Sequence, residues 1–191
     1  VNSHIRSVAD GFAEQGYLAI APHAFARVQP GVELGYGADD VAQGRTLKAA
    51  AEALPAPGVM ADIASAINFG ASDTGGKVAV VGYCWGGLLV WRSACSLPGL
   101  SAAIAYYGGG MTSEAEAQRQ NLCPVLCHFG EQDHAIPLEG VKAFAQAQPA
   151  VAVHTYAAQH GFNCDQRGAY DAAAAALARE RTLGFLAQHL A

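Results

Sequence analysis

Apolar residues gather in short runs along this chain, separated by polar and glycine-rich segments. Runs of about five residues bounded by turn residues are typical of strands in a parallel sheet that is covered on both faces. The run at 78–81 is apolar throughout, and we expect it to form a central strand that is buried on both faces. On this pattern we predict strands at residues 17–21, 78–81, 102–106, 124–129 and 151–156.

Helical features fill the intervals between these runs. Asn2 or Ser3 is positioned to cap a helix that carries Ile5 and Val8 on its apolar face. We predict further helices at 45–54, 59–69, from 87 onward, 113–120, 137–147 and 169–190, and a loop at 29–40. Strands that alternate with helices predict an α/β fold, with a mostly parallel sheet and helices on both faces. Because no repeat, linker or second core interrupts the pattern, we expect one domain over residues 1–191.

The segment after the strand at 78–81 carries the first candidate for chemistry. Gly82 and Gly86 frame Cys84 in a G-x-C-x-G motif, and an apolar run that can open a helix follows. A strand, a tight turn and a helix with a nucleophile at the apex form a nucleophile elbow, here with Cys in place of Ser. The glycines let strand and helix approach closely, and the helix N-terminus favours the thiolate. The alternative is an inert buried cysteine after an ordinary turn.

Two further strand ends carry the partners that a nucleophile needs. Asp133 follows the strand at 124–129, and His160 follows the strand at 151–156. The carboxyl ends of parallel strands meet at one edge of a sheet, and the order nucleophile, acid, histidine is that of the α/β-hydrolases. We expect Cys84 to attack an acyl carbon, His160 to move the proton, and Asp133 to orient the imidazole. Taken singly, Asp133 fits a turn residue and His160 a hydrogen-bonded loop histidine.

Composition narrows the class of protein. Of the 191 residues, 52% are hydrophobic, and the net charge of −5 offers no basic stripe for nucleic acid. No apolar run has the length of a membrane helix, and no signal peptide is visible. The five cysteines, an odd number, fit reduced thiols in a cytoplasmic enzyme. Cys123 and Cys127 share one face of a predicted strand without a second ligand pair, so we expect no metal and no cofactor.

These motifs resemble the dienelactone hydrolase family (carboxymethylenebutenolidases) of the α/β-hydrolase superfamily. The matching segments are VVGYCWGG at 80–87, AYYG at 105–108, HFGEQDHAIP at 128–137, VHTY at 153–156, HGF at 160–162, and ERT with FL at 180–186. The resemblance implies the α/β-hydrolase fold and hydrolysis of a small lactone or ester such as dienelactone through a Cys acyl-enzyme. It also implies that the backbone N–H of Trp85 is one donor of the oxyanion hole.

The chain departs from the family pattern at several positions. Of the two family arginines that hold the substrate carboxylate, one corresponds to Cys164 here, and Arg167 is the candidate to replace it. Arg45 is the nearest candidate for the other, and His23 stands where the family has Asp. The second oxyanion donor and a family glutamate belong to a loop that would precede Val1. We therefore expect that N-terminal strands are missing from this chain.

The departures leave other hypotheses open. A truncated or decayed family member would keep the fold with little catalysis. A glutaminase of the amidotransferase type would use a Cys-His-Glu set, which the Asp133 loop and the His160 motif argue against. As partner we expect a small-molecule lactone or ester, no nucleic acid and no membrane, and we expect a monomer or small homo-oligomer.

Overall fold

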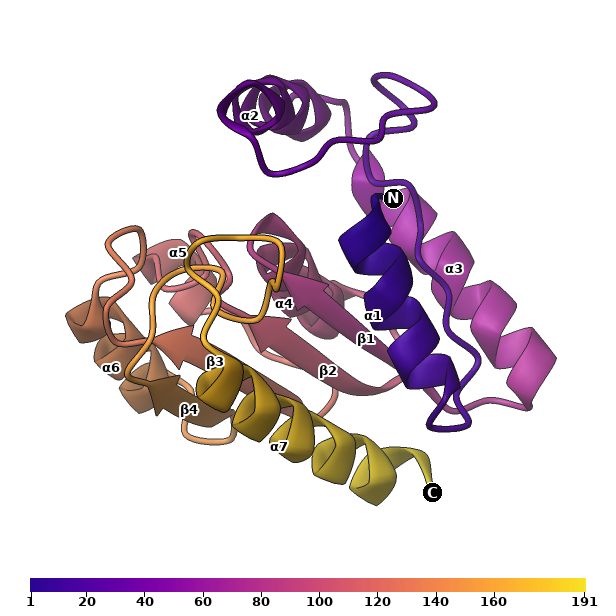
Figure 1. Ribbon diagram of the computed structural model, residues 1–191. Helices are drawn as coiled ribbons and strands as arrows, with labels where there is room; N and C mark the ends of the chain where they lie inside the picture. The colour runs from indigo at the N-terminus through magenta and orange to yellow at the C-terminus, as the bar shows by residue number, and fades with distance from the viewer. The chain divides into compact units, whose positions relative to one another are not determined.

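The computed structural model describes all residues, 1–191, in two compact units (Figure 1). The first unit is Val1–Gly76 and the second is Lys77–Ala191. All candidate catalytic residues belong to the second unit, so the geometry of the site is described within it. The expectation of one domain over the whole chain stays a prediction.

The first unit is helical. Its helices are α1 Ser3–Ala13, α2 Ala38–Glu52 and α3 Val59–Thr74. The Asn2 side chain caps α1 by accepting a 3.0 Å hydrogen bond from the backbone N–H of Ile5, as expected. α2 begins seven residues earlier than predicted, inside the predicted loop, where Asp39 and Asp40 lie in its first turn. Carboxylates stabilise the N-terminal end of a helix, and the pattern of apolar residues contains no information about this effect.

The prediction of a strand at 17–21 is wrong. These residues belong to no strand, and Leu18 and Ile20 are 50% and 41% exposed. The sheet of the structure consists of four strands that all come from the second unit. A strand is stabilised by hydrogen bonds to a neighbouring strand and by packing on one face. An apolar run of suitable length, such as residues 17–21, does not by itself provide a neighbouring strand or a surface to pack against.

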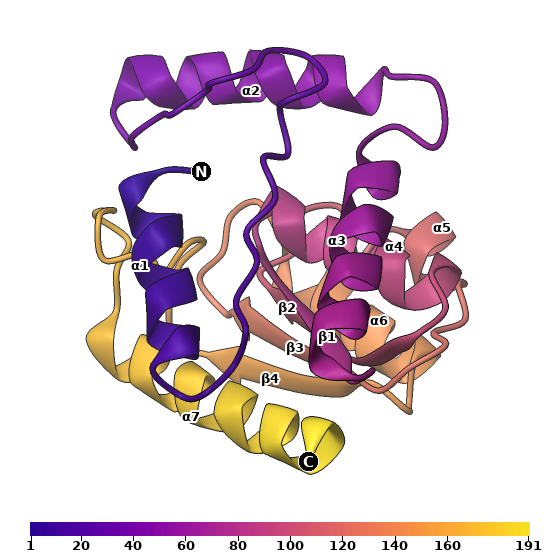
Figure 2. The same cartoon turned by 90° about the vertical axis from the view of Figure 1, so that its right-hand side faces the viewer.

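The second unit contains a parallel sheet with helices on both faces (Figures 1 and 2). Its strands are β1 Val78–Tyr83, β2 Leu100–Tyr106, β3 Val125–Gly130 and β4 Ala152–Tyr156, in the spatial order β1-β2-β3-β4. Its helices are α4 Trp85–Ser96, α5 Glu114–Ala117, α6 Leu138–Ala147 and α7 Ala172–Leu190. The helices that connect the strands lie on one face of the sheet, and α7 covers the other (Figure 2). The predicted α/β architecture is confirmed.

The core of the second unit lies on β2 and β3. Residues 102–105 of β2 are fully buried, and the Trp91 ring of α4 meets the Phe144 ring of α6 edge-on at 5.1 Å. β1, by contrast, lies at the edge of the sheet, and its residues 78–81 are only partly buried. The expectation that this strand is central and buried on both faces is therefore wrong. Its carboxyl end nevertheless lies beside that of β2, which is what the site requires.

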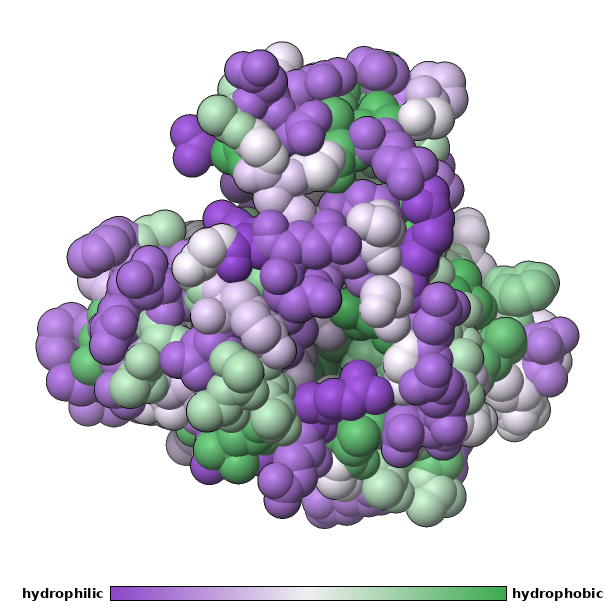
Figure 3. All heavy atoms as spheres, in the orientation of Figure 1, coloured by the Kyte–Doolittle hydropathy of each residue, from purple (hydrophilic) through white to green (hydrophobic).

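The surface of the second unit mixes hydrophilic and hydrophobic side chains on the face shown in Figure 3. Large apolar side chains are exposed singly, at Leu122, Tyr170 and Leu177. Isolated exposure of this kind is ordinary for a globular protein. Among the helices, none combines the length and the apolar character needed to cross a membrane.

Candidate active site

Cys84 occupies a strained position between β1 and α4. Its φ of 54° lies in the left-handed region, and α4 begins at the next residue. Its backbone N–H donates a 3.0 Å hydrogen bond to the carbonyl of Tyr106 at the end of β2. A Cβ on Gly82 would lie 2.2 Å from the carbonyl oxygen of Gly86, so only glycine permits this approach of strand and helix. The geometry is that of the predicted elbow.

Asp133 and His160 extend from Cys84 in a line. The His160 Nε2 lies 3.1 Å from the Cys84 Sγ, and its Nδ1 lies 2.7 Å from the Asp133 Oδ2. The other carboxylate oxygen, Oδ1, accepts from the backbone N–H groups of Ala135 and Ile136 at 2.8 and 3.1 Å. Asp133 therefore fits both interpretations of the sequence, because one carboxylate oxygen stabilises the turn and the other contacts the imidazole of His160. Its side chain is fully buried, whereas that of His160 is 20% exposed.

The electrostatics favour a thiolate beside an imidazolium. Desolvation alone would raise the pKa of the Cys84 thiol, but the hydrogen bond and charge of His160, the backbone N–H of Trp85 and the charge of Arg167 lower it overall. Desolvation likewise opposes protonation of His160, yet the Asp133 carboxylate and the Cys84 sulfur raise its pKa to about 9. The negative charge on Cys84 and the positive charge on His160 stabilise each other, as in an ion pair.

Of the other predicted site residues, Trp85 and Arg167 lie beside Cys84 and His160, whereas Arg45 belongs to the first unit. Trp85 is the first residue of α4, so its backbone N–H is at the helix N-terminus beside the sulfur. Arg167 lies against the residue that follows His160, since a Cβ on Gly161 would be 2.7 Å from its Nη1. Cys164 is buried. Arg45 is an exposed residue of α2 in the first unit, and its role stays a prediction.

Three other cysteines, Cys95, Cys123 and Cys127, have the opposite character to Cys84. Burial raises the pKa of Cys95 and of Cys123 to about 11, and it raises the pKa of Cys127 further. A thiol that stays protonated is a poor nucleophile and a poor metal ligand. Their surroundings therefore suit the interpretation of Cys123 and Cys127 as packing residues.

Tyr107 lies directly after β2 and contributes to the site. Its φ of 36° makes it, with Cys84, one of the two residues other than glycine with positive φ. Its ring centroid lies 5.1 Å from that of His160 and 5.3 Å from that of Phe162. The ring therefore forms a wall against the imidazole. The signal in the sequence was its place directly after a strand, which does not reveal the backbone conformation.

Comparison with known proteins identifies the family of this chain. The model of the dienelactone hydrolase family matches residues 1–190. A carboxymethylenebutenolidase from Pseudomonas putida is 33% identical over 193 residues, which cover 98% of this chain and 80% of that protein. A crystal structure of a Klebsiella pneumoniae protein assigned to the dienelactone hydrolases is 29% identical, with a TM-score of 0.77 over 97% of this chain and 81% of that one. A dienelactone hydrolase-like phosphotriesterase from metagenomic libraries, 22% identical, shares the fold with a TM-score of 0.73. The chain therefore belongs to the dienelactone hydrolase family, with the α/β-hydrolase fold.

Proposed function

We propose that this chain hydrolyses a small, dienelactone-like lactone or ester through a Cys84-His160-Asp133 triad and a covalent acyl-enzyme. As a member of its family it is a carboxylic-ester hydrolase, and the proposal concerns how it works. The observation that carries it is the line from Sγ to Nε2 at 3.1 Å and from Nδ1 to Oδ2 at 2.7 Å. A nucleophile in contact with a base that is oriented by a third group is the arrangement that acyl transfer requires.

The first half of the reaction acylates the sulfur. The Cys84 thiolate attacks the carbonyl carbon, and the backbone N–H of Trp85 donates to the oxyanion that forms. When the tetrahedral intermediate collapses, the C–O bond to the leaving group breaks and His160 Nε2 donates its proton to the departing alkoxide. In a lactone this alcohol stays tethered to the acyl group, so the ring opens while the thioester forms.

The second half returns the enzyme to its starting state. The now neutral His160 takes a proton from water, and the resulting hydroxide attacks the thioester carbon. Collapse of this second intermediate releases the carboxylic acid and the thiolate. Asp133 stabilises the imidazolium at both stages and takes no proton from it.

Arg167 is the proposed contact for a substrate carboxylate. Its guanidinium lies beside Gly161, next to His160, and its charge lowers the pKa of Cys84. A guanidinium binds a carboxylate through paired hydrogen bonds, which an ammonium group does not reproduce. A lactone that carries a carboxylate is therefore the favoured substrate class.

Trapping of the acyl-enzyme tests the proposal. Brief mixing with p-nitrophenyl acetate followed by mass spectrometry should find one acetyl group, on Cys84, in the protein and none in Cys84→Ala. His160→Ala should acylate slowly, and it should deacylate more slowly still. A protein that neither acylates nor turns over this ester or dienelactone would be a family member with the fold and little catalysis, contrary to the proposal.

A further inference from the structure

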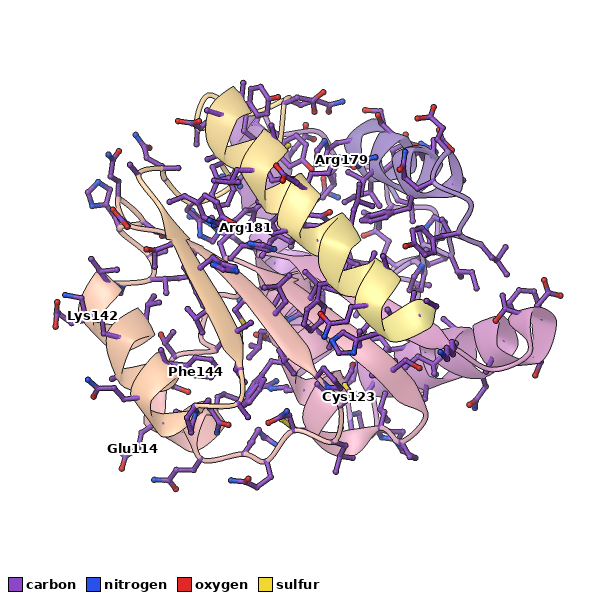
Figure 4. The ribbon with its side chains drawn as sticks, turned by 90° about the horizontal axis from the view of Figure 1, so that it is seen from below. Glu114, Cys123, Lys142, Phe144, Arg179 and Arg181 are labelled. Atoms are coloured by element: carbon purple, nitrogen blue, oxygen red, sulfur yellow. The ribbon has the colours of Figure 1, made fainter.

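A chain of hydrogen bonds between side chains lies between the sheet and α7, apart from the triad. The His128 ring of β3 is fully buried, with Nδ1 2.8 Å from the Tyr156 hydroxyl and Nε2 3.0 Å from the Thr182 Oγ1. The Tyr106 hydroxyl lies 2.7 Å from the same Thr182 oxygen, and Arg181 donates to the Tyr156 hydroxyl over 3.1 Å. Figure 4 shows Arg181 reaching from α7 toward the strands. We call these five residues the His128 network.

The donors and acceptors of the network fit one arrangement of protons. A guanidinium only donates, so the Tyr156 oxygen accepts from Arg181 and its own O–H donates to Nδ1 of His128. Burial and the nearby charges of His154 and Arg181 lower the pKa of His128 to about 3, so the ring is neutral and its proton is on Nε2. That proton is donated to Thr182. Every ring nitrogen therefore has a partner, and the imidazole is held in one orientation.

The main chain of the same residues carries the catalytic loops. The carbonyl of Tyr106 accepts from the backbone N–H of Cys84 at 3.0 Å. The carbonyl of Tyr156 accepts from Glu131, which opens the Asp133 loop, at 2.8 Å, and from Ala158, which precedes His160, at 2.7 Å. The carbonyl of His128 accepts from Tyr107, whose ring packs against His160, at 2.7 Å. Cys84 is thus one hydrogen bond away from a network residue, and Asp133 and His160 each lie two residues along the chain from a residue that donates to one.

We propose that His128 is a positioning residue, which together with Thr182 fixes the ends of β2, β3 and β4 and thereby the distances within the triad. The inference rests on the proposed function, since the triad is what the network positions. The hydrogen bonds from His160 to Cys84 and Asp133 are short, and a misplacement of about 1 Å originating far from the chemistry costs on the order of 10²-fold in rate. The hydrogen bonds of the network add side-chain links between the three strand ends to the backbone ladder that pairs them.

The test replaces Thr182 with Val, which keeps its shape and removes the hydroxyl that joins Tyr106 to His128. The readout is the pH dependence of alkylation of Cys84 by iodoacetamide, with kcat/KM on p-nitrophenyl acetate measured in parallel. We expect alkylation at neutral pH to slow by about tenfold or more, because a misplaced His160 no longer lowers the pKa of Cys84. The Thr182→Ser variant, which restores the hydroxyl, should recover most of the rate. If Thr182→Val does not fold, Tyr156→Phe removes another hydroxyl of the network and carries the same expectation.

A matched control separates positioning from loss of stability. Leu186 lies one turn further along α7 and is also buried, so Leu186→Ala should lower stability but leave the alkylation profile unchanged at temperatures where the protein is folded. The inference is overturned if Thr182→Val alkylates like the wild type, if Thr182→Ser fails to recover the rate, or if Leu186→Ala slows alkylation equally. Alkylation needs no ester substrate. A wild type with a fast, selective thiol but no turnover would therefore count against the proposed function and leave the positioning role standing.

Discussion

Adding one methyl group to the elbow at Gly82 should destabilise the protein, whereas the same change at Gly86 should not. In Gly82→Ala the new Cβ would lie 2.2 Å from the carbonyl oxygen of Gly86, 2.5 Å from its carbonyl carbon and 2.8 Å from the Val90 Cγ2. Two of these atoms are backbone, so relief requires β1 and α4 to separate. Overpacking of this kind costs about 1–3 kcal/mol, and rigid backbone neighbours favour the upper part of that range.

Gly86→Ala is the control, because a Cβ there meets no atom within 4 Å. Gly86 lies within α4, where Ala is favoured over Gly by about 0.4–1 kcal/mol. Urea unfolding followed by far-UV circular dichroism should show a lower midpoint for Gly82→Ala and an equal or higher one for Gly86→Ala, with similar slopes. If both variants unfold at the same urea concentration, the steric explanation of the motif is wrong.

The site supports four further predictions. Substoichiometric iodoacetamide should label Cys84 well before Cys95, whose pKa of about 11 leaves it protonated at neutral pH; equal labelling by mass spectrometry would contradict the thiolate. Asp133→Asn should keep the turn, because its amide oxygen can still accept from the loop, and yet reduce kcat by about 10⁴, as in other triads; near-normal kcat would remove Asp133 from the mechanism. Arg167→Lys should raise KM for a lactone bearing a carboxylate more than for p-nitrophenyl acetate, and equal effects would exclude the carboxylate contact. His128 has a pKa of about 3 in the folded state, against the ordinary 6.5 when unfolded, so the unfolded chain binds the proton first as the pH falls. The free energy of unfolding should therefore decrease from about pH 6.5 toward pH 3. This group contributes on the order of 4 kcal/mol to that decrease. Urea unfolding of His128→Gln over the same range should show a weaker pH dependence, and an identical dependence would refute the assignment.

The strands of the second unit and the meeting of Cys84, Asp133 and His160 could be predicted from the sequence because both follow from local signals. Each apolar run of the second unit formed a strand, and the residues after three of these runs met at one edge of the sheet. Parallel strands make this inference simple, because all their carboxyl ends point the same way. The prediction needed no knowledge of which strands are neighbours.

Features that depend on neighbours were not predictable in this way. The run at 17–21 has the composition of a strand but no partner in the sheet, and the run at 78–81 lies at an edge where it is only half-buried. The hydrogen bond between His128 and Thr182 joins residues 54 positions apart on different elements. A histidine in an apolar strand signals that a polar partner must exist, since buried polar groups are paired, but it does not say where.

The strained backbone at Cys84 makes the position of the proposed nucleophile a compromise between reactivity and stability. At a φ of 54° a glycine is unstrained, whereas a residue with a side chain is disfavoured by about 1–2 kcal/mol. Within the fold alone, glycine at this apex would therefore be the better residue, and selection for stability would favour it. A thiol at a position where the backbone prefers no side chain is what selection for reactivity would produce, so the strain supports the proposed role of Cys84 as the nucleophile.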